Sequence, residues 1–179
     1  MKYRLISFVV TLIAVVITGA YIAHAEEQPD NVLTDEQRSV IVANCTNIQA
    51  TLNRIHQNDA LARYNRGHLY RAIIDRLMSP LNQRIASNQL DGSELVQTSA
   101  RYNTQYQGFF TAYREYELAL RDAMDIDCTK QPVDFYEAVT NARKKRLLVR
   151  DASVKLLDLA EQYKNHFNNF RSIRQEANL

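Results

Sequence analysis

The fold is decided by residues 95–123, which read LVQTSARYNTQYQGFFTAYREYELALRDA. Apolar and small residues recur in this stretch at alternating steps of four and three. They are Leu95, Ser99, Tyr102, Tyr106, Phe109, Tyr113, Tyr116, Leu120 and Ala123. A repeat of mean period 3.5 is typical of helices that pack like coiled coils. It predicts a long helix with a buried aromatic face, and the alternative is an exposed aromatic surface that stacks on sugars or peptides. Phe110 lies off the seam and is the better candidate for exposure.

The stretch is bounded by breaks on both sides. Residues 88–93 are expected to form a turn with Ser93 as a helix N-cap, and residues 127–132 end the seam. A further helix is predicted from about 133 to 176. Its seam is Phe135, Val139, Ala142, Val149, Leu156, Ala160, Tyr163, Phe167 and Phe170, with Arg146 as an exception. Leu148, Ala152 and Leu159 are expected to widen this face.

A first helix is predicted from a capping box at Thr34 and Gln37 to about Ser87. Its apolar face is read as Ile41, Cys45, Ile48, Leu52 and Ile55, then Leu69, Ile73, Leu77, Leu81 and Ile85. Poor helix formers at residues 57–67 interrupt the stripe. One bent helix, or two helices meeting there, fits this pattern. Pro80 is expected to kink the last turns because it has no amide donor.

The fold class that follows is all-α. With only 4 glycines and 3 prolines, the sequence lacks the turns of a β-sandwich or barrel. Long helices with short connections favour antiparallel neighbours. We expect an elongated antiparallel three-helix bundle with coiled-coil-like packing, preceded by an N-terminal signal or anchor helix. Residues 34–179 form the expected helical extracytoplasmic domain.

The N-terminus has the order of an export signal. Lys2 and Arg4 precede an apolar run, and Ala23-His24-Ala25 matches an Ala-x-Ala cleavage site. Residues 1–25 are therefore predicted to be a signal peptide or, if uncleaved, a membrane anchor long enough to span a bilayer. Residues 26–33 are expected to be a linker. Both alternatives place the remainder outside the cytoplasm, anchored in the membrane or secreted after cleavage near Ala25.

Charge excludes one class of partner. The formal net charge is +2, and Lys2 and Arg4 account for it, so the exported part is neutral. Nucleic-acid binding needs a net basic footprint and is not expected. The one basic cluster consists of Arg143, Lys144, Lys145, Arg146 and Arg150. It is a candidate contact for anionic lipid headgroups or an acidic polymer, and the alternative is a solvated helix face.

No motif for catalysis or metal binding is present. None of His24, His56, His68 and His166 lies in a helical metal-ligand spacing, and Gly-x-Ser-x-Gly and Ser-x-x-Lys are both absent. The sequence predicts neither an enzyme nor a bound cofactor.

The two cysteines are predicted to pair. Cys45 and Cys128 both lie in the exported part, where disulfides persist. A straight hairpin of the first two helices would leave them about 13 Å apart along the axis. A break in the first helix near residues 58–67, together with an extended loop after Asp127, is expected to close that gap.

Two functions of different class follow. The first is a non-enzymatic envelope or surface protein that acts as a protein-interaction or spacer module. The second is a small-ligand-binding or sensor-like domain with a pocket near the weak middle of the first helix. Asp59, Arg66 and Asn103 are the candidate lining residues. The sequence leaves the partner and the oligomeric state open.

Overall fold

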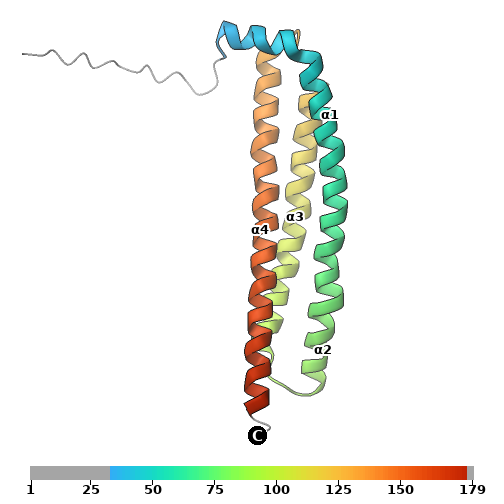
Figure 1. Cartoon of the computed structure of the whole chain (residues 1–179), viewed down its shortest axis with the longest axis vertical. Helices are drawn as coiled ribbons and strands as arrows, with labels where there is room; N and C mark the ends of the chain where they lie inside the picture. The colour runs from blue at the N-terminus through green and yellow to red at the C-terminus, as the bar shows by residue number, and fades with distance from the viewer. Residues whose placement is uncertain (1–32, 177–179) are drawn as a thin grey trace, which may run out of the picture. The chain divides into compact units, whose positions relative to one another are not determined.

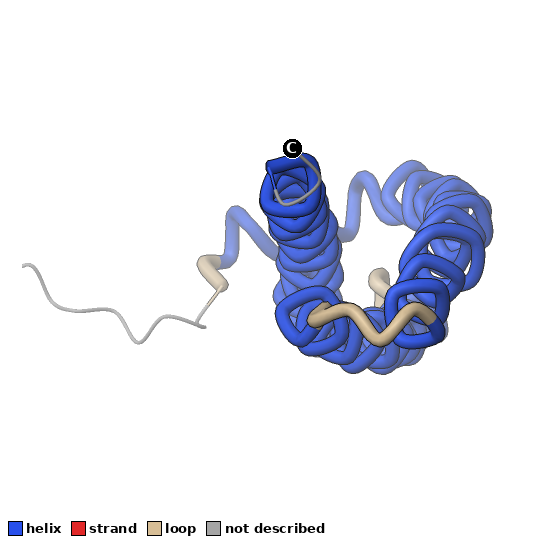
Figure 2. Tube along the Cα trace, turned by 90° about the horizontal axis from the view of Figure 1, so that it is seen from below, coloured by secondary structure: helices blue, strands red, loops and turns tan. Residues whose placement is uncertain are grey.

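A computed structural model describes residues 33–176, and every regular element in that range is a helix (Figure 1; Figure 2). The elements are α1 (Asp35–Ala72), the π-helical segment η1 (Ile73–Met78), α2 (Ser79–Ser87), α3 (Ser93–Asp125) and α4 (Pro132–Glu176). The all-helical prediction is confirmed. The signal or anchor at residues 1–25 and the linker up to residue 32 lie outside the described residues. Within residues 33–176, no helix combines sufficient length with sufficient apolarity to cross a membrane.

The first long helix is continuous from α1 through η1 into α2. Of the two alternatives for residues 57–67, one bent helix or two helices meeting there, the second is wrong, because those residues are helical throughout. The distortion expected near Pro80 is present as the π-helical turn that precedes it. There the Ser79 amide donates to the Ile74 carbonyl, five residues back. A proline at the following position has no amide to continue the α-helical ladder.

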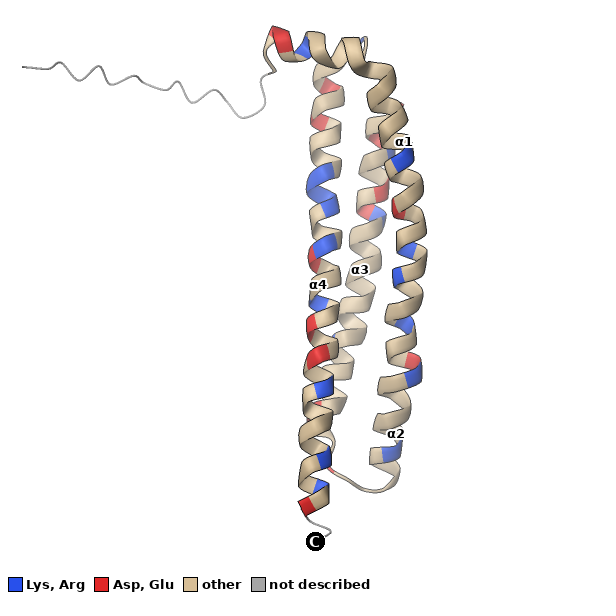
Figure 3. Ribbon diagram, viewed as in Figure 1, with Lys and Arg blue, Asp and Glu red and all other residues tan. Residues whose placement is uncertain are grey.

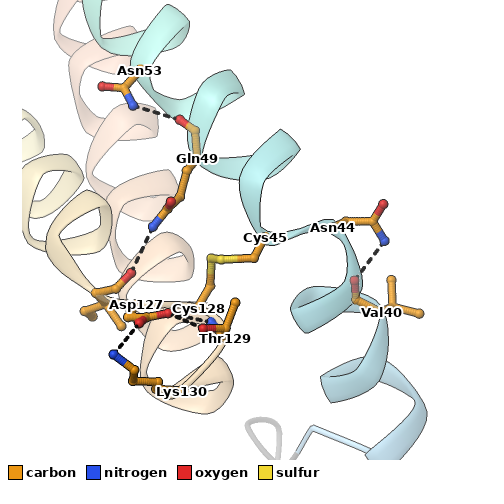
Figure 4. The surroundings of a disulfide bond; sticks show 10 residues. Val40, Asn44, Cys45, Gln49, Asn53, Asp127, Cys128, Thr129 and Lys130 are labelled. Atoms are coloured by element: carbon orange, nitrogen blue, oxygen red, sulfur yellow. Dashed lines mark hydrogen bonds and ion pairs between the residues drawn. A yellow bond between two sulfur atoms is a disulfide. The ribbon is translucent and has the colours of Figure 1, made fainter.

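The first helix bends close to its start. Figure 1 shows the first turns of α1 lying across one end of the bundle, and Figure 4 shows the ribbon changing direction near Asn44 and Cys45. The Asn44 side-chain amide donates to the Val40 carbonyl at 2.8 Å. A side chain that competes for a backbone carbonyl is a recognised cause of helix bending. This bend, and not a central break, brings the two cysteines together.

One helix cap agrees with the sequence and one does not. The Thr34 hydroxyl accepts from the Gln37 amide at 3.2 Å, and the Gln37 side chain accepts from the Thr34 amide at 2.9 Å. This capping box was predicted. Ser93 is not the N-cap of α3, because Gly92 occupies that position and Ser93 is the first helical residue. The Ser93 amide instead donates to the Asp91 carboxylate at 3.1 Å.

The core lies mainly between α3 and α4, which form the most extensive helix–helix contact. The predicted α3 seam is confirmed, since all its residues are buried except half-buried Ser99. On α4, Phe135, Ala142, Leu156 and Tyr163 are buried.

Leu148 does not widen the core face of α4 as expected. Leu148 is 49% exposed because it points away from the core face of α4. Phe110 is less buried than the aromatic residues of the seam, as expected, but it is still half-buried, because its ring lies against Gly67 and packs edge-on to Tyr106 and Phe109.

Part of the second half of the first helix buries residues one position later than predicted, although Ile85 is buried as expected. Leu69 and Leu77 are 56% and 62% exposed, whereas Tyr70, Ile74 and Met78 are buried. The face approaches α3 at Gly67, where a Cβ would lie 3.0 Å from the Phe110 ring. Tyr70 follows Gly67 by one turn and packs edge-on against Phe109. The close approach of Gly67 to α3 therefore decides which residues of the following turns face the core.

Candidate functional site

A polar cluster joins α1, α3 and α4 midway along the bundle. The Asp59 carboxylate accepts two hydrogen bonds from the Arg146 guanidinium, at 2.8 Å from Nε and 2.9 Å from Nη2. It also accepts a bond from the Tyr116 hydroxyl at 2.7 Å. Arg146 is the residue that interrupts the apolar seam of α4, and Asp59 lies in the weak middle of the first helix. The two residues that interrupt the apolar patterns of α1 and α4 are thus hydrogen-bonded to each other.

This cluster forms one wall of a pocket of about 410 Å³. The pocket is lined from three helices by Asp59, Ala62, Arg63, Arg66, Phe109, Tyr113, Tyr116, Arg143, Arg146, Leu147, Val149 and Arg150. We call it the arginine pocket. Its charged lining residues are five arginines and a single aspartate, so the lining has a formal net charge of +4.

Helical spacing explains why these residues converge. Positions three, four and seven residues apart lie on one face of an α-helix. Arg143, Arg146 and Arg150 follow that spacing on α4, and Asp59, Arg63 and Arg66 follow it on α1. The aromatic side chains of α3 form the floor between these two faces. Figure 3 shows basic residues on both α1 and α4 along the middle of the bundle.

The five guanidinium groups differ in how far they are already neutralised. Arg146 is held by Asp59, and this hydrogen bond is the main cause that raises the pKa of Arg146. Arg63 lies 4.9 Å from the centre of the Tyr113 ring and 3.8 Å from Glu117. Arg150 has one long contact of 3.5 Å with Asp151. Arg66 and Arg143 have no ion-pair partner among residues 33–176, so their charge is available to a ligand.

The tyrosine in the cluster acts as a fixed donor. Burial raises the pKa of the Tyr116 hydroxyl, and its hydrogen bond to Asp59 raises it further. The hydroxyl therefore remains protonated across the physiological range. With three donors on its two oxygens, Asp59 positions Arg146 and Tyr116 and has little accepting capacity left for anything else.

The predicted basic cluster is divided between two surfaces. Arg143, Arg146 and Arg150 line the pocket, whereas Lys145 bonds Glu115 of α3 at 2.9 Å. That bond is the main cause that lowers the pKa of Glu115. Lys144 is exposed and lies outside the pocket lining. The contact with an anionic surface remains a prediction, and three of its five residues line the arginine pocket.

Two of the three residues predicted to line a ligand pocket do so, and two of the histidines contact side chains nearby. Asp59 and Arg66 line the arginine pocket, but Asn103 is exposed on α3 and does not. His166 lies 2.8 Å from Glu94, and His68 packs edge-on against Tyr64. In the part of the chain that the structure describes, no three candidate metal ligands cluster.

The two cysteines lie at disulfide distance, as predicted. The Cα atoms of Cys45 and Cys128 are 5.6 Å apart, and both side chains are buried (Figure 4). Near this link the Gln49 side chain donates to the Ile126 carbonyl at 3.4 Å. The Asp127 carboxylate accepts from the Thr129 amide and hydroxyl, and this lowers the pKa of Asp127 to about 2. The loop after α3 is thus ordered against the bend of α1.

A second hollow was missed by the sequence reasoning. A groove of about 900 Å³ lies between the first long helix and α4, toward the end of the bundle near α2. Its apolar lining residues include Ile73, Leu77, Leu81, Leu157 and Phe167. The sequence does contain a signal for it, because Leu77 is predicted on the core face and the structure leaves it exposed.

Comparison with known proteins gives no further information on this site. No protein-family model, curated protein or solved structure matches the chain.

Proposed function

We propose that the chain is a non-enzymatic extracytoplasmic binding domain whose arginine pocket holds a compact anionic ligand with phosphate or carboxylate groups. The observation that carries the proposal is the convergence of five arginines and one aspartate on a single hollow between three helices. The extracytoplasmic placement rests on the signal or anchor expected at residues 1–25.

The chemistry of the lining supports an oxyanion ligand. A guanidinium group presents a planar fork of donors that matches two oxygens of a phosphate or carboxylate. Arg66 lines the pocket from α1 and Arg143 lines it from α4, and neither has an ion-pair partner in residues 33–176. Phe109, Leu147 and Val149 supply apolar walls. Such walls lower the local dielectric and strengthen the attraction of each charge for the ligand.

The size and placement of the pocket support a small ligand over a polymer. Its volume of about 410 Å³ falls within the range of small-molecule sites. The arginines approach the hollow from two facing helices, whereas a polymer-binding surface would present its charges along one open face.

Titration calorimetry with the full chain tests the proposal, with pyrophosphate and citrate as probes at low ionic strength. We expect saturable binding of at least one probe. Replacing Arg66 or Arg143 by Gln should weaken it about tenfold or more, because a charge-assisted bond contributes about 1.5–3 kcal/mol. Arg54→Gln is the matched control on α1, since Arg54 is exposed and lies outside the pocket lining.

Two results would count against the pocket as the site. One is the absence of saturable binding for both probes. The other is an equal loss of affinity in Arg54→Gln, which would indicate a diffuse effect of charge over the whole surface. Binding should also weaken as salt rises, but it should remain saturable at physiological ionic strength.

The protein-interaction or spacer role remains a second proposal. It is supported by the long seams of α3 and α4, whose period favours coiled-coil-like antiparallel packing into an elongated three-helix bundle. It is also supported by the open apolar groove beside α2, which ligand binding in the arginine pocket does not use.

A further inference from the structure

The apolar groove has the form of an unfilled helix–helix interface. Its two walls come from the first long helix and from α4, which run in the same direction (Figure 1). Each wall repeats its lining residues at steps of three and four. These are Ile73, Leu77, Pro80 and Arg84 on one wall, and Leu157, Ala160, Lys164 and Phe167 on the other. That spacing is what a further packed helix requires.

Large apolar side chains stand exposed on both walls. Leu77 is 62% exposed, and Leu157 across the groove is 56% exposed. Leu69, one turn before the lining residues of the first helix, is 56% exposed. A run of exposed leucines on two adjacent helices indicates a surface that is covered when the protein functions.

The charges beside the groove are separated by wall. The wall of the first helix has Arg76 and Arg84, which have no ion-pair partner within residues 33–176. The α4 wall has Asp158, Glu161 and Lys164, for a net charge of −1. Lys164 already contacts Glu161 at 2.9 Å on the exposed surface. A partner that fits this groove must present acidic groups to one wall and basic groups to the other.

We infer that the groove is the interface between two copies of this chain, related by a two-fold axis parallel to the helices. Rotation about such an axis places the first helix of each copy opposite α4 of the other. The basic wall then faces the acidic wall on both sides, and the exposed leucines of both copies meet in the middle. A two-fold axis across the helices would instead place basic wall against basic wall.

The register of this pairing follows from a contact within one chain. The Tyr163 hydroxyl donates to the Met78 carbonyl, 85 residues earlier, so these positions lie at the same height along the bundle. By the same offset Arg76 is level with Glu161. In the parallel pair, Arg76 of each copy is therefore level with Glu161 of the other.

The N-terminal end of the chain favours the same orientation. Residues 1–25 are predicted to be a signal or anchor, and an anchored chain leaves its membrane at the end where α1 begins. Two anchored copies can approach each other side by side only if these ends lie together. The parallel pair meets this requirement, whereas an antiparallel pair would hold the two anchors at opposite ends.

Photo-crosslinking of the full chain in intact cells tests the inference. A photoreactive residue replaces Leu77 in one variant and Leu61 in a matched control. Leu61 lies on the same helix with the same 62% exposure but outside the groove lining. We expect the Leu77 variant to give a product with twice the 20.7 kDa mass, containing only this chain by mass spectrometry. No such product, or a product with another protein or a lipid, would overturn the inference.

A charge exchange tests the register independently of folding. Arg76→Glu alone and Glu161→Arg alone should each greatly reduce the crosslinked dimer, because each places like charges in contact. The combined variant should restore it. Circular dichroism of each purified variant checks that the helices are intact. If the dimer persists in both single variants, or if the combination fails to restore it in a folded protein, the proposed pairing is wrong.

Discussion

Replacing Asp59 by Asn should destabilise the bundle by about 2–3 kcal/mol. The carboxylate accepts two bonds from Arg146 and one from Tyr116. Bonds to charged groups contribute about 1.5–3 kcal/mol each. The Arg146 side chain is 55% exposed, so its share is reduced by solvent, whereas Tyr116 is 2% exposed and its bond to the charged oxygen is little screened. Asn preserves the shape and one accepting oxygen.

Equilibrium urea denaturation is the assay, with thermal melting in support. A loss of this size should lower the melting temperature by about 5–10 °C for a domain of this length. Asp122→Asn is the control, because Asp122 is exposed on α3 and its replacement should change stability by less than about 0.5 kcal/mol.

A double-mutant cycle with Arg146→Gln isolates the interaction. We expect a coupling energy of about 1 kcal/mol or more between the two positions. Additivity within about 0.5 kcal/mol would refute the reasoning, because it would mean that the pair contributes nothing specific. The same Asp59→Asn variant should bind the anionic probe more tightly, since it removes the only acid from the pocket lining and releases Arg146. Stability and affinity should thus change in opposite directions.

Three further predictions concern the disulfide, the tyrosines and export. Non-reducing mass spectrometry should find Cys45 bonded to Cys128. Reduction should lower the free energy of unfolding by about 4–5 kcal/mol, as loop-closure entropy predicts for a loop of 83 residues. Two free thiols in protein from its own compartment would contradict this. Burial raises the pKa of Tyr163 to about 12, and it also raises the pKa values of Tyr102 and Tyr116. The contribution of these tyrosines to the free energy of unfolding should be unchanged below pH 10, where they are protonated in both states, and should fall between pH 10 and 12, because the unfolded chain loses those protons first. Absorbance at 295 nm should show tyrosines that titrate late. A single transition near pH 10 with no loss of stability would argue against the raised pKa values. A fusion of residues 1–40 to a reporter that is active only outside the cytoplasm should be active, and an inactive fusion with soluble, cytoplasmic full-length protein would exclude export.

The apolar seam that was predicted in full belongs to a helix with one side buried along its whole length. The α3 seam from Leu95 to Ala123 is flanked by other helices throughout, so apolar periodicity and burial coincide. The first helix is different because its inward face carries Asp59, Arg63 and Gly67 before it reaches Tyr70. From the sequence, the interruption fits either a bend or a meeting of two helices, and the apolar face is predicted to resume one residue early, at Leu69. The polar residues Asp59 and Arg63 in fact lie on the inward face of one continuous helix, and they line the arginine pocket.

The site was only partly accessible from sequence for a related reason. Asp59 and Arg66 had been named as pocket residues and Arg146 as an exception to a seam, but 87 residues separate Asp59 from Arg146. Periodicity on one helix gives the direction in which a residue faces, and it does not give the height of that residue against another helix. That height depends here on the bend near Cys45 and on the link to Cys128. The link follows from the two cysteines, but the bend sets no local apolar pattern and cannot be located from residue spacing.

The covalent link at the bend determines how the domain transmits tension. A pull on the N-terminal end of the described chain reaches Cys45 after the first ten or so residues of α1, and the disulfide passes it directly to Cys128 in the loop between α3 and α4. The load then enters the most closely packed pair of helices, and the rest of α1 is bypassed. The arginine pocket, which depends on the height of Asp59 against Arg146, lies beyond this junction and is shielded from mechanical strain at the end of the chain.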